Sequence, residues 1–490
     1  MIIHPKSILP AIVSLAIGLS QLSCRKMVTV PNPVLSITTN AVFTTDAQAS
    51  SAMAGIYTQL VNGSLSFSNG YLTILGGMSA DELYYYGVGD AQIKAFSPNQ
   101  LLSTNSYSYI IWTSAYKAIY GANAVIEGIV ASTSTGLTDS VRKELTAEAK
   151  FIRAFAYFYL TSLFGDVPLA MTVDFNKTRY MPRTPAKDVY QQILTDLKDA
   201  QSVLPPDYSV AGAPDYERVI PNKWAATALL ARVYLYMGDY TNAANQATAV
   251  INNTSLYSLA TDPAKVFLTN SREAIWQLKQ GTAVSPYWNA TLEGFALIPY
   301  PKLTGRAFYC MTDQLLNAFE PGDLRRSAWV DSTNNTPYGG ASAGLTFYPF
   351  KYKIGSYNAI NGAPSTEYYM ALRLAEIYLI RAEAEANGAA GGSAAAIGDL
   401  KLIRNRAGLG DLPSSLTPAE VVAAVAHERQ VELFAEWGHR WLDLNRTGQA
   451  HNVLSGIPGK QPWAGDYQLL YPIPSAEIQS DHFLTQNTGY

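Results

Sequence analysis

The sequence predicts an all-α, mostly helical fold built from tetratricopeptide-like helical hairpins. Apolar residues recur three and four positions apart in residues 112–126, 145–163, 190–204 and 372–386, so that each set lies on one face of a helix. The segment 223–251 contains two helical patterns joined by a tight turn, with alanines where the helices cross, which is typical of a tetratricopeptide unit. No regular period runs through the whole sequence, so we expect a few irregular hairpins and not a regular solenoid.

Capping residues predict where several helices begin and end. Thr184 and Thr417 each precede a proline, which indicates an N-cap followed by proline at the first helical position. Glu420 stands three residues after Thr417 and completes a capping box. Three glycines stand where helices should stop: Gly165, Gly238 and Gly388.

The N-terminus has the pattern of an export signal. Lys6 is followed by an apolar stretch that is too short to span a membrane, and the stretch ends at Ser23-Cys24. We predict a lipoprotein signal peptide over residues 1–23, lipidation of Cys24 and an extended tether over residues 24–40. The alternative is an ordinary signal peptide with an incidental cysteine. Residues 41–490 then form a single helical domain.

Composition excludes several classes of protein. Of the 490 residues, 48% are hydrophobic and 15% are charged, which allows a large core and argues against disorder. The net charge is −3 and no long basic run occurs, so we expect no nucleic-acid partner. Cys310 is the other cysteine, and we expect a buried, unreactive side chain there.

Three segments interrupt the helical pattern: residues 61–104, 281–310 and 327–369. They are rich in glycine, asparagine and aromatic residues, and the chain holds 32 tyrosines in all. Loops this long are commonly functional. A helical scaffold that carries long aromatic loops indicates a binding protein.

Residues 427–448 (HERQVELFAEWGHRWLDLNRTG) have the composition of an active site but not its spacing. A zinc-binding helix would need a histidine four residues after His427, where Val431 stands. We expect Glu428, Glu432 and Glu436 to share one face, Arg429 to pair with Glu432, the helix to break near Gly438, and Trp441 to be buried. These charges are therefore predicted to brace the scaffold.

No other motif predicts an enzyme. The letters GASAG (340–344) match a nucleophile elbow around Ser342, but their flanks indicate a loop and not the strand and helix that an elbow needs. We expect no catalytic residue, no metal and no cofactor. Paired carboxylates of a glycoside hydrolase stay open, because they come from distant parts of a chain.

Several segments together resemble one family. ERQVELFAEWGHRWLDLNRTG (428–448), ELTAEAKFIRAFAYFYLTSLFGDVPLA (144–170) and the ending YPIPSAEIQSDHFLTQNTGY (471–490) resemble the SusD/RagB family of outer-membrane lipoproteins of Bacteroidetes. Residues 184–205, 223–251, 372–387 and 401–409 resemble further family segments in the same order, so the resemblance spans nearly all of the chain after the signal.

The resemblance implies a right-handed superhelix of four tetratricopeptide-like hairpins that works without catalysis. It implies a SusC-like TonB-dependent outer-membrane transporter as the partner, and oligosaccharides, or in some members peptides, as the ligand. It also implies that the lipid on Cys24 holds the protein on the outer membrane, facing the cell surface. Arg25 and Lys26 depart from the acidic residues that often follow the cysteine in surface-exposed members.

The family motifs belong to the scaffold, so the ligand residues are predicted from physical chemistry. Aromatic faces stack on sugar rings, while polar side chains bind hydroxyl groups. The candidates come from the irregular segments: Asp81, Tyr84, Tyr85, Tyr86, Tyr287, Trp288, Asn289, Arg306, Trp329 and Tyr338. Peptide capture, a glycoside hydrolase and a scaffold that binds nothing alone are the competing hypotheses.

Overall fold

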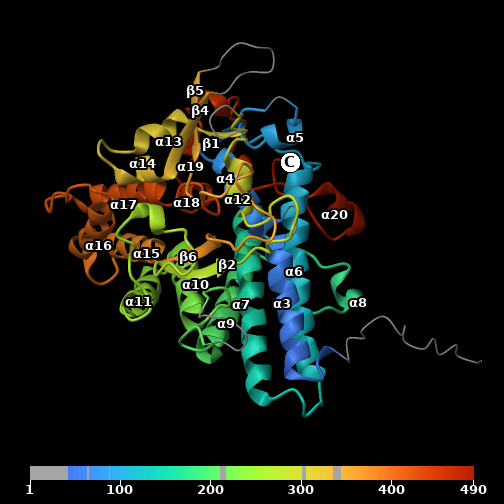
Figure 1. The fold of residues 1–490 in the computed structure, drawn as a ribbon. Helices are drawn as coiled ribbons and strands as arrows, with labels where there is room; N and C mark the ends of the chain where they lie inside the picture. Colours follow the sequence, from blue (N-terminus) through green and yellow to red (C-terminus); the bar gives the residue numbers. More distant parts are fainter. Residues whose placement is uncertain (1–41, 63–65, 88, 210–216, 301–304, 335–343) are drawn as a thin grey trace, which may run out of the picture. The chain divides into compact units, whose positions relative to one another are not determined.

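A computed structural model describes residues 42–62, 66–87, 89–209, 217–300, 305–334 and 344–490 (Figure 1). The predicted signal peptide, the tether, Cys24, Tyr338 and Ser342 lie outside these residues. Phe43–Tyr490 form one compact unit. Among the described helices, none combines the length and the apolar composition that a membrane span requires.

The predicted mostly helical fold is confirmed, and each predicted helical face packs on a neighbouring helix. α6 packs on α7, α7 on α9, α9 on α10, α10 on α11, α11 on α15 and α15 on α16 (Figure 1). Gly238 (φ +72°) forms the tight turn between α10 and α11, as predicted. The bounds are α6 (Ser106–Ala131), α7 (Asp139–Phe164), α9 (Ala186–Val203), α10 (Lys223–Tyr236), α11 (Tyr240–Ile251), α15 (Leu374–Ala386), α16 (Gly392–Arg406) and α17 (Pro418–Glu432).

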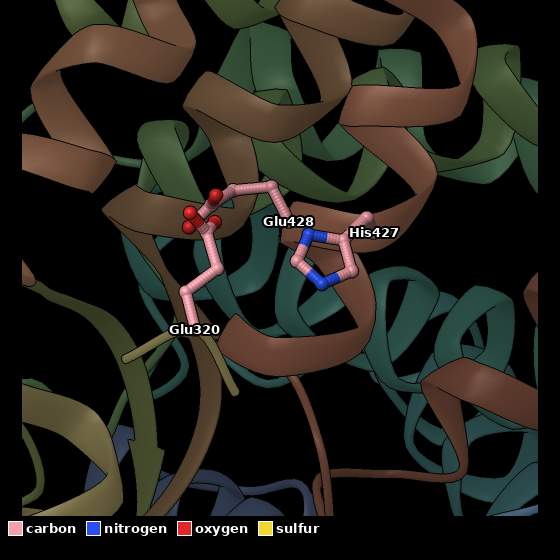
Figure 2. A group of neighbouring side chains, drawn as sticks. All are labelled: Glu320, His427 and Glu428. Atoms are coloured by element: carbon pink, nitrogen blue, oxygen red, sulfur yellow. The ribbon is translucent and has the colours of Figure 1, made fainter. Parts of the chain in front are cut away.

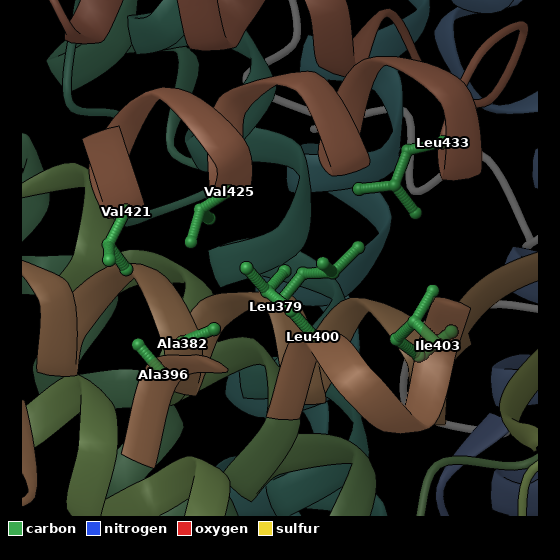
Figure 3. Packing of buried hydrophobic residues seen from close by; sticks show 9 residues of the cluster. Leu379, Ala382, Ala396, Leu400, Ile403, Val421, Val425 and Leu433 are labelled. Carbon is green, nitrogen blue, oxygen red and sulfur yellow. The ribbon is translucent and has the colours of Figure 1, made fainter. Parts of the chain in front are cut away.

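Small residues allow the last of these helices to approach closely. Ala382 of α15 faces Ala396 of α16, while Val421 and Val425 of α17 point toward them (Figure 3). All four side chains are fully buried. Apolar contact along one face of each helix therefore provides the core that the periodicity predicts.

The capping predictions are confirmed at α17 and wrong at α9. The Thr417 side chain accepts the backbone N–H of Glu420, and the Glu420 carboxylate accepts that of Thr417 in return. At α9 the N-cap is Pro185, and Thr184 lies in a short bridge to Val167. Asp166 accepts the N–H of Ala186 instead, so a distant carboxylate replaces the predicted local cap.

The segments predicted to be irregular also contain short antiparallel strand pairs. β1 (Leu83–Tyr85) pairs with β3 (Tyr309–Met311), and β4 (Val330–Asn334) pairs with β5 (Leu345–Pro349). The buried strand β2 (Ala274–Leu278) pairs with β6 (Tyr369–Arg373). The pairing of β1 with β3 fixes residues of the 61–104 and 281–310 segments against one another.

Residues 61–104 are more helical than predicted. They contain α4, a helix in which every residue is buried. The remaining helices are α3 (Asp46–Asn62), η2 (Phe67–Tyr71), α4 (Leu72–Ser79), α5 (Ala91–Lys94), α8 (Phe175–Thr178), η4 (Pro263–Lys265), α12 (Leu292–Leu297), α13 (Asp313–Ala318), α14 (Leu324–Trp329), α18 (His439–Arg446), α19 (Ala450–Leu454), η5 (Pro458–Lys460), η6 (Asp466–Leu469) and α20 (Ser475–Ser480).

Two glycines bring α18 against α4. A Cβ atom on Gly76 would lie 2.7 Å from the Cα of Gly438, so only glycine fits at this contact. Gly438 has φ +68° and is the N-cap of α18, and the helical run breaks over residues 433–438, near the predicted position, because α17 ends at Glu432. Since α4 also contacts β1 and η2, this close approach connects the C-terminal helices to the aromatic segments.

Candidate functional site

The strand β1 divides the three consecutive tyrosines between two environments. Side chains alternate along a strand, so Tyr84 and Tyr86 share one face and Tyr85 takes the other. Tyr84 and Tyr86 pack against a buried cluster that includes Cys310 and Tyr348. Tyr85 lies across from Tyr309 on β3. Cys310 is fully buried, as predicted.

Tyr85 belongs to a group of aromatic side chains drawn from separate segments. Its ring centroid lies 5.6 Å from that of Tyr309 and 6.3 Å from that of Phe308. Tyr71 and Tyr107 stack on each other at 5.9 Å. We call the following residues the aromatic group: Tyr71, Tyr85, Tyr107, Tyr287, Phe308 and Tyr309.

The electrostatics of the tyrosines show that they are neighbours. Burial raises the pKa of Tyr309 far above its ordinary value, and Tyr71, Tyr107, Tyr85 and Asp90 raise it further. Burial, Tyr287 and Asp90 together raise the pKa of Tyr71 to about 12. The hydroxyl groups therefore stay protonated near neutral pH and are hydrogen-bond donors, and that of Tyr107 already donates to Asp90.

Asp90 supplies the polar centre of the aromatic group. Its carboxylate accepts the Tyr107 hydroxyl and caps α5 by accepting the N–H groups of Gln92 and Ile93. The rings around it are half-buried, except that Phe308 is 43% exposed. Half-exposed rings beside a fixed carboxylate offer apolar faces and hydrogen-bonding groups at one place.

Three of the predicted ligand residues are buried in the scaffold, and these predictions need correction. Trp329 is fully buried, and its Nε1–H donates to the carbonyl of Pro263 at 2.8 Å. Asp81 is 4% exposed, and both of its oxygens accept hydrogen bonds from Arg440 at 2.8 Å. Their polar atoms are occupied within the protein, so neither side chain presents a group to a ligand.

Asn289 is the third buried residue. Its Oδ1 accepts the backbone N–H of Ile360 at 2.7 Å, so it ties two loops together. Its neighbour Trp288 is half-buried and has φ +49°, which is uncommon for a residue other than glycine. Tyr287 packs edge-on against Phe295 of α12 at 5.1 Å. Arg306 is half-buried and lies two residues before Phe308.

Of the ten predicted residues, the structure thus places Tyr85 and Tyr287 in the aromatic group. The prediction omits Tyr71, Tyr107, Phe308, Tyr309 and Asp90. The antiparallel pairing of β1 with β3 would have indicated Tyr309, since it lies opposite Tyr85. Tyr107 gives no such signal, because its contacts to Tyr71 and Asp90 depend on the tertiary fold.

The charged residues of 427–448 form a buried network, as predicted. Arg373 donates to Glu432 at 2.6 Å, to Glu436 at 2.8 Å and to Glu273 at 3.0 Å. Arg325 bridges Glu428 and Glu432, which confirms that these two glutamates share one face, whereas Glu436 lies beyond the end of α17. We call the residues of this cluster the charge network: Glu273, Asp323, Arg325, Lys351, Arg373, Arg406, Glu428, Glu432 and Glu436.

Ion pairing with arginines determines the protonation state of Glu432 in the charge network. Burial acts to raise the pKa of Glu432, but Arg406, Arg373 and Arg325 outweigh it and hold the pKa well below its ordinary value. The predicted pair of Arg429 with Glu432 is wrong. Arg429 binds Asp443 of α18 at 2.8 Å, because the arginines of the network already surround Glu432.

One group of side chains in this region has a composition that a metal ion could use. The ligand atoms of Glu320, His427 and Glu428 lie within 4.8 Å of one another (Figure 2). Arg404 donates to Glu320, Arg325 donates to Glu428, and the Nε2 of His427 lies 2.8 Å from the carbonyl oxygen of Ala318. Guanidinium groups already neutralise both carboxylates, so the group fits an ion-pair brace better than a metal site.

The fold and the aromatic group together define a class: a helical-repeat protein that presents half-exposed rings on loops. Residues 53–235 match the family described as "Starch-binding associating with outer membrane", and residues 324–490 match the family described as "SusD family". The chain belongs to the SusD/RagB family.

Relatives match along nearly the whole chain. SusD-like protein P2 of Formosa agariphila is 25% identical over 497 residues, which cover 94% of this chain and 95% of the relative. A solved structure titled "Laminarin binding SusD-like protein" is 26% identical, has a TM-score of 0.75, and covers 91% of this chain and 100% of its own. A SusD superfamily protein from Bacteroides vulgatus has a TM-score of 0.77 at 22% identity, with coverage of 91% and 100%, and supports the fold alone.

Proposed function

We propose that this protein captures oligosaccharides at the outer membrane and delivers them to a SusC-like TonB-dependent transporter, without breaking a bond. The observation that carries the proposal is the aromatic group around Asp90. Lipidation of Cys24 would anchor the protein at the cell surface. The transporter and the lipid come from the family resemblance and from the sequence of the N-terminus.

The chemistry of the aromatic group suits a sugar. A pyranose ring presents flat C–H faces and a rim of hydroxyl groups, so it needs both a stacking surface and hydrogen-bond partners. Tyr85 and Phe308 supply stacked rings, while Asp90 and the tyrosine hydroxyls supply acceptors and donors. The name of the laminarin-binding relative and the family description, which mentions starch, support a carbohydrate ligand.

The helical scaffold supports a role in binding rather than catalysis. In the charge network, each carboxylate is held by a guanidinium or ammonium group. Such carboxylates cannot act as a general acid and base without breaking buried ion pairs. In the aromatic group, the Asp90 carboxylate caps a helix and binds Tyr107.

Calorimetry of the purified protein against a panel of polysaccharides and peptides tests the proposal. We expect binding to at least one glycan with no new reducing ends after prolonged incubation. Release of reducing ends would replace the proposal with a glycoside hydrolase. Binding to peptides alone would indicate peptide capture, and no binding at all would indicate a scaffold that stabilises its transporter.

The variant Tyr85→Ala+Tyr309→Ala tests whether the glycan binds at the aromatic group. We expect it to abolish glycan binding at this site. Leu402→Ala is the matched control, because Leu402 is 44% exposed on α16 and belongs to neither the aromatic group nor the charge network. If the double variant bound glycan as well as Leu402→Ala does, the site would lie elsewhere.

A further inference from the structure

A cavity opens on the side of α6 that faces away from the aromatic group. Its volume is about 560 Å³, which falls within the range of small-molecule sites. Residues of α6, the segment 168–181 and the C-terminal segment 477–484 line it. At about 100° per residue, Tyr116 lies about 180° around α6 from Tyr107, so the two sites use opposite faces of one helix.

The walls of this cavity are held rigidly. The Tyr116 hydroxyl donates to the carbonyl of Pro168 at 2.8 Å, and the Asn123 amide donates to that of Ala170 at 2.9 Å. Trp112 is 2% exposed and packs edge-on against Phe164 behind the wall. Because these bonds fix the segment 168–170 against α6, the cavity is formed before any ligand arrives.

Exposed rings surround the opening. Tyr120 is 59% exposed, Phe175 is 69% exposed and Tyr180 is 45% exposed, and all three line the cavity. Burial of large aromatic side chains is strongly favourable, so three exposed rings around one cavity indicate a binding surface. The Arg179 guanidinium lies 5.1 Å from the ring centre of Tyr180 and adds hydrogen-bond donors beside the rings.

Two carboxylates face the rings from the C-terminal segment. Asp481 is 8% exposed, and its Oδ1 accepts the backbone N–H of Phe483. Glu477 is half-buried, and burial raises the pKa of its carboxyl group. Both residues line the cavity with Arg179. Two carboxylates and one guanidinium provide acceptors and donors with an excess of negative charge, which disfavours an anionic ligand.

We propose that this cavity is a second carbohydrate-binding site, which takes a neutral saccharide by stacking on Tyr120, Phe175 and Tyr180 and by hydrogen bonds to Glu477, Asp481 and Arg179. We call it the α6 cavity. The inference rests on the proposed function, since it assigns the same class of ligand to a separate site. Two sites on one protein would hold one long glycan at two points, or two short ones independently.

The test is calorimetric titration of the purified protein with maltoheptaose, laminarihexaose and an oligogalacturonate. For a neutral glycan that binds, we expect two sites per protein. The variant Tyr120→Ala+Tyr180→Ala should lose binding at the α6 cavity and keep the site at the aromatic group with unchanged affinity. The variant Tyr85→Ala+Tyr309→Ala should lose the site at the aromatic group and keep the α6 cavity. Tyr120 is 59% exposed, and Tyr180 is 45% exposed but packs against His482 at 4.8 Å, so the first variant should lower the melting temperature only slightly.

Two single variants separate stacking from charge. Tyr120→Phe keeps the ring and should retain binding at the α6 cavity. Glu477→Gln keeps the shape and removes an acceptor of charge-assisted hydrogen bonds, so it should weaken this site by about tenfold. Oligogalacturonate should not bind there.

Each contrary result has a distinct meaning. A single site in the wild-type protein that Tyr120→Ala+Tyr180→Ala leaves unchanged would overturn the second site and preserve the proposed function. Binding of peptides but not glycans at the α6 cavity would overturn its assignment to carbohydrate. If the wild-type protein bound no glycan of a broad panel, the proposed function would fail, and the second site with it.

Discussion

The charge network and the aromatic group are built on opposite principles. Glu432 is fully buried and meets three arginines, so its charge is satisfied within the protein. The rings of the aromatic group are half-exposed and come from five separate segments. The conspicuous charges of residues 427–448 therefore hold the scaffold, whereas ordinary loop tyrosines form the candidate site. Composition alone would have assigned these roles the other way round.

The largest effect on stability is expected when Glu432, which contacts three arginines of the charge network, is replaced. Glu432→Ala removes the carboxylate that Arg325, Arg373 and Arg406 all contact, so we expect a loss of about 3–5 kcal/mol in the free energy of unfolding. Chemical denaturation measures it. Glycan affinity of the protein that remains folded should not change. A variant as stable as the wild type would mean that the arginines find other partners.

Replacement of a buried tryptophan should lower the free energy of unfolding by nearly as much. Trp441 is fully buried and stacks near Tyr471, and Trp329 is equally buried. Alanine at either position should lower the free energy of unfolding by about 3–5 kcal/mol through the cavity it leaves. Trp288→Ala in the loop should cost less. Normal folding of Trp329→Ala together with lost glycan binding would restore Trp329 as a ligand residue.

A pH effect of intermediate size is expected at His439, whose buried imidazole lies near the ion pairs Arg232–Glu376 and Arg429–Asp443. Burial lowers the pKa of its imidazole from 6.5 to about 4 in the folded protein. The neutral ring therefore contributes stability above about pH 6.5, and this is lost as the pH falls from 6.5 toward 4, by about 3 kcal/mol in total.

Comparison with His439→Gln isolates this contribution. Buried glutamates such as Glu148 have a pKa raised to about 8 by burial, and they act in the opposite direction over the same range. They are common to both proteins, so they cancel in the difference between wild type and variant. Denaturation at about pH 7.5 and about pH 4.5 should show the wild type losing more stability. Equal losses would mean that His439 is already protonated in the folded state.

The smallest effect on stability is expected in the aromatic group. Phe308 is 43% exposed, so Phe308→Ala should leave the melting temperature nearly unchanged. It should weaken glycan binding by about tenfold, since one stacking face is lost. Calorimetry measures both sites separately. An unchanged affinity with a lowered melting temperature would move Phe308 from the ligand surface to the scaffold.

Sequence periodicity predicted the helical part of the fold because each helix buries one continuous face. The helices α6, α7, α9, α10 and α15 appear where that pattern indicated. Local capping rules worked at Thr417, where the partner is three residues away, and failed at Thr184, where Asp166 supplies the cap. Contacts that are close in sequence were predictable, and those set by the tertiary fold were not.

The candidate site was harder to predict for the same reason. Tyr85 and Tyr287 were chosen for their aromatic loops, but the same rule also chose Trp329 and Asp81, which the fold buries. Loop composition does not reveal which side chains the rest of the fold buries. Strand pairing does, because it sets Tyr85 beside Tyr309 and turns Tyr84 toward the interior.

The run Tyr84-Tyr85-Tyr86 makes the candidate site tolerant of slippage. A shift of one residue in the pairing of β1 with β3 would exchange the two faces of the strand. In most strands such an exchange would replace a ligand-facing ring by an unsuitable side chain. Here a tyrosine takes the position of Tyr85 and of one of its two neighbours, while Leu83 or Gly87 takes the position of the other, so both faces keep one aromatic ring.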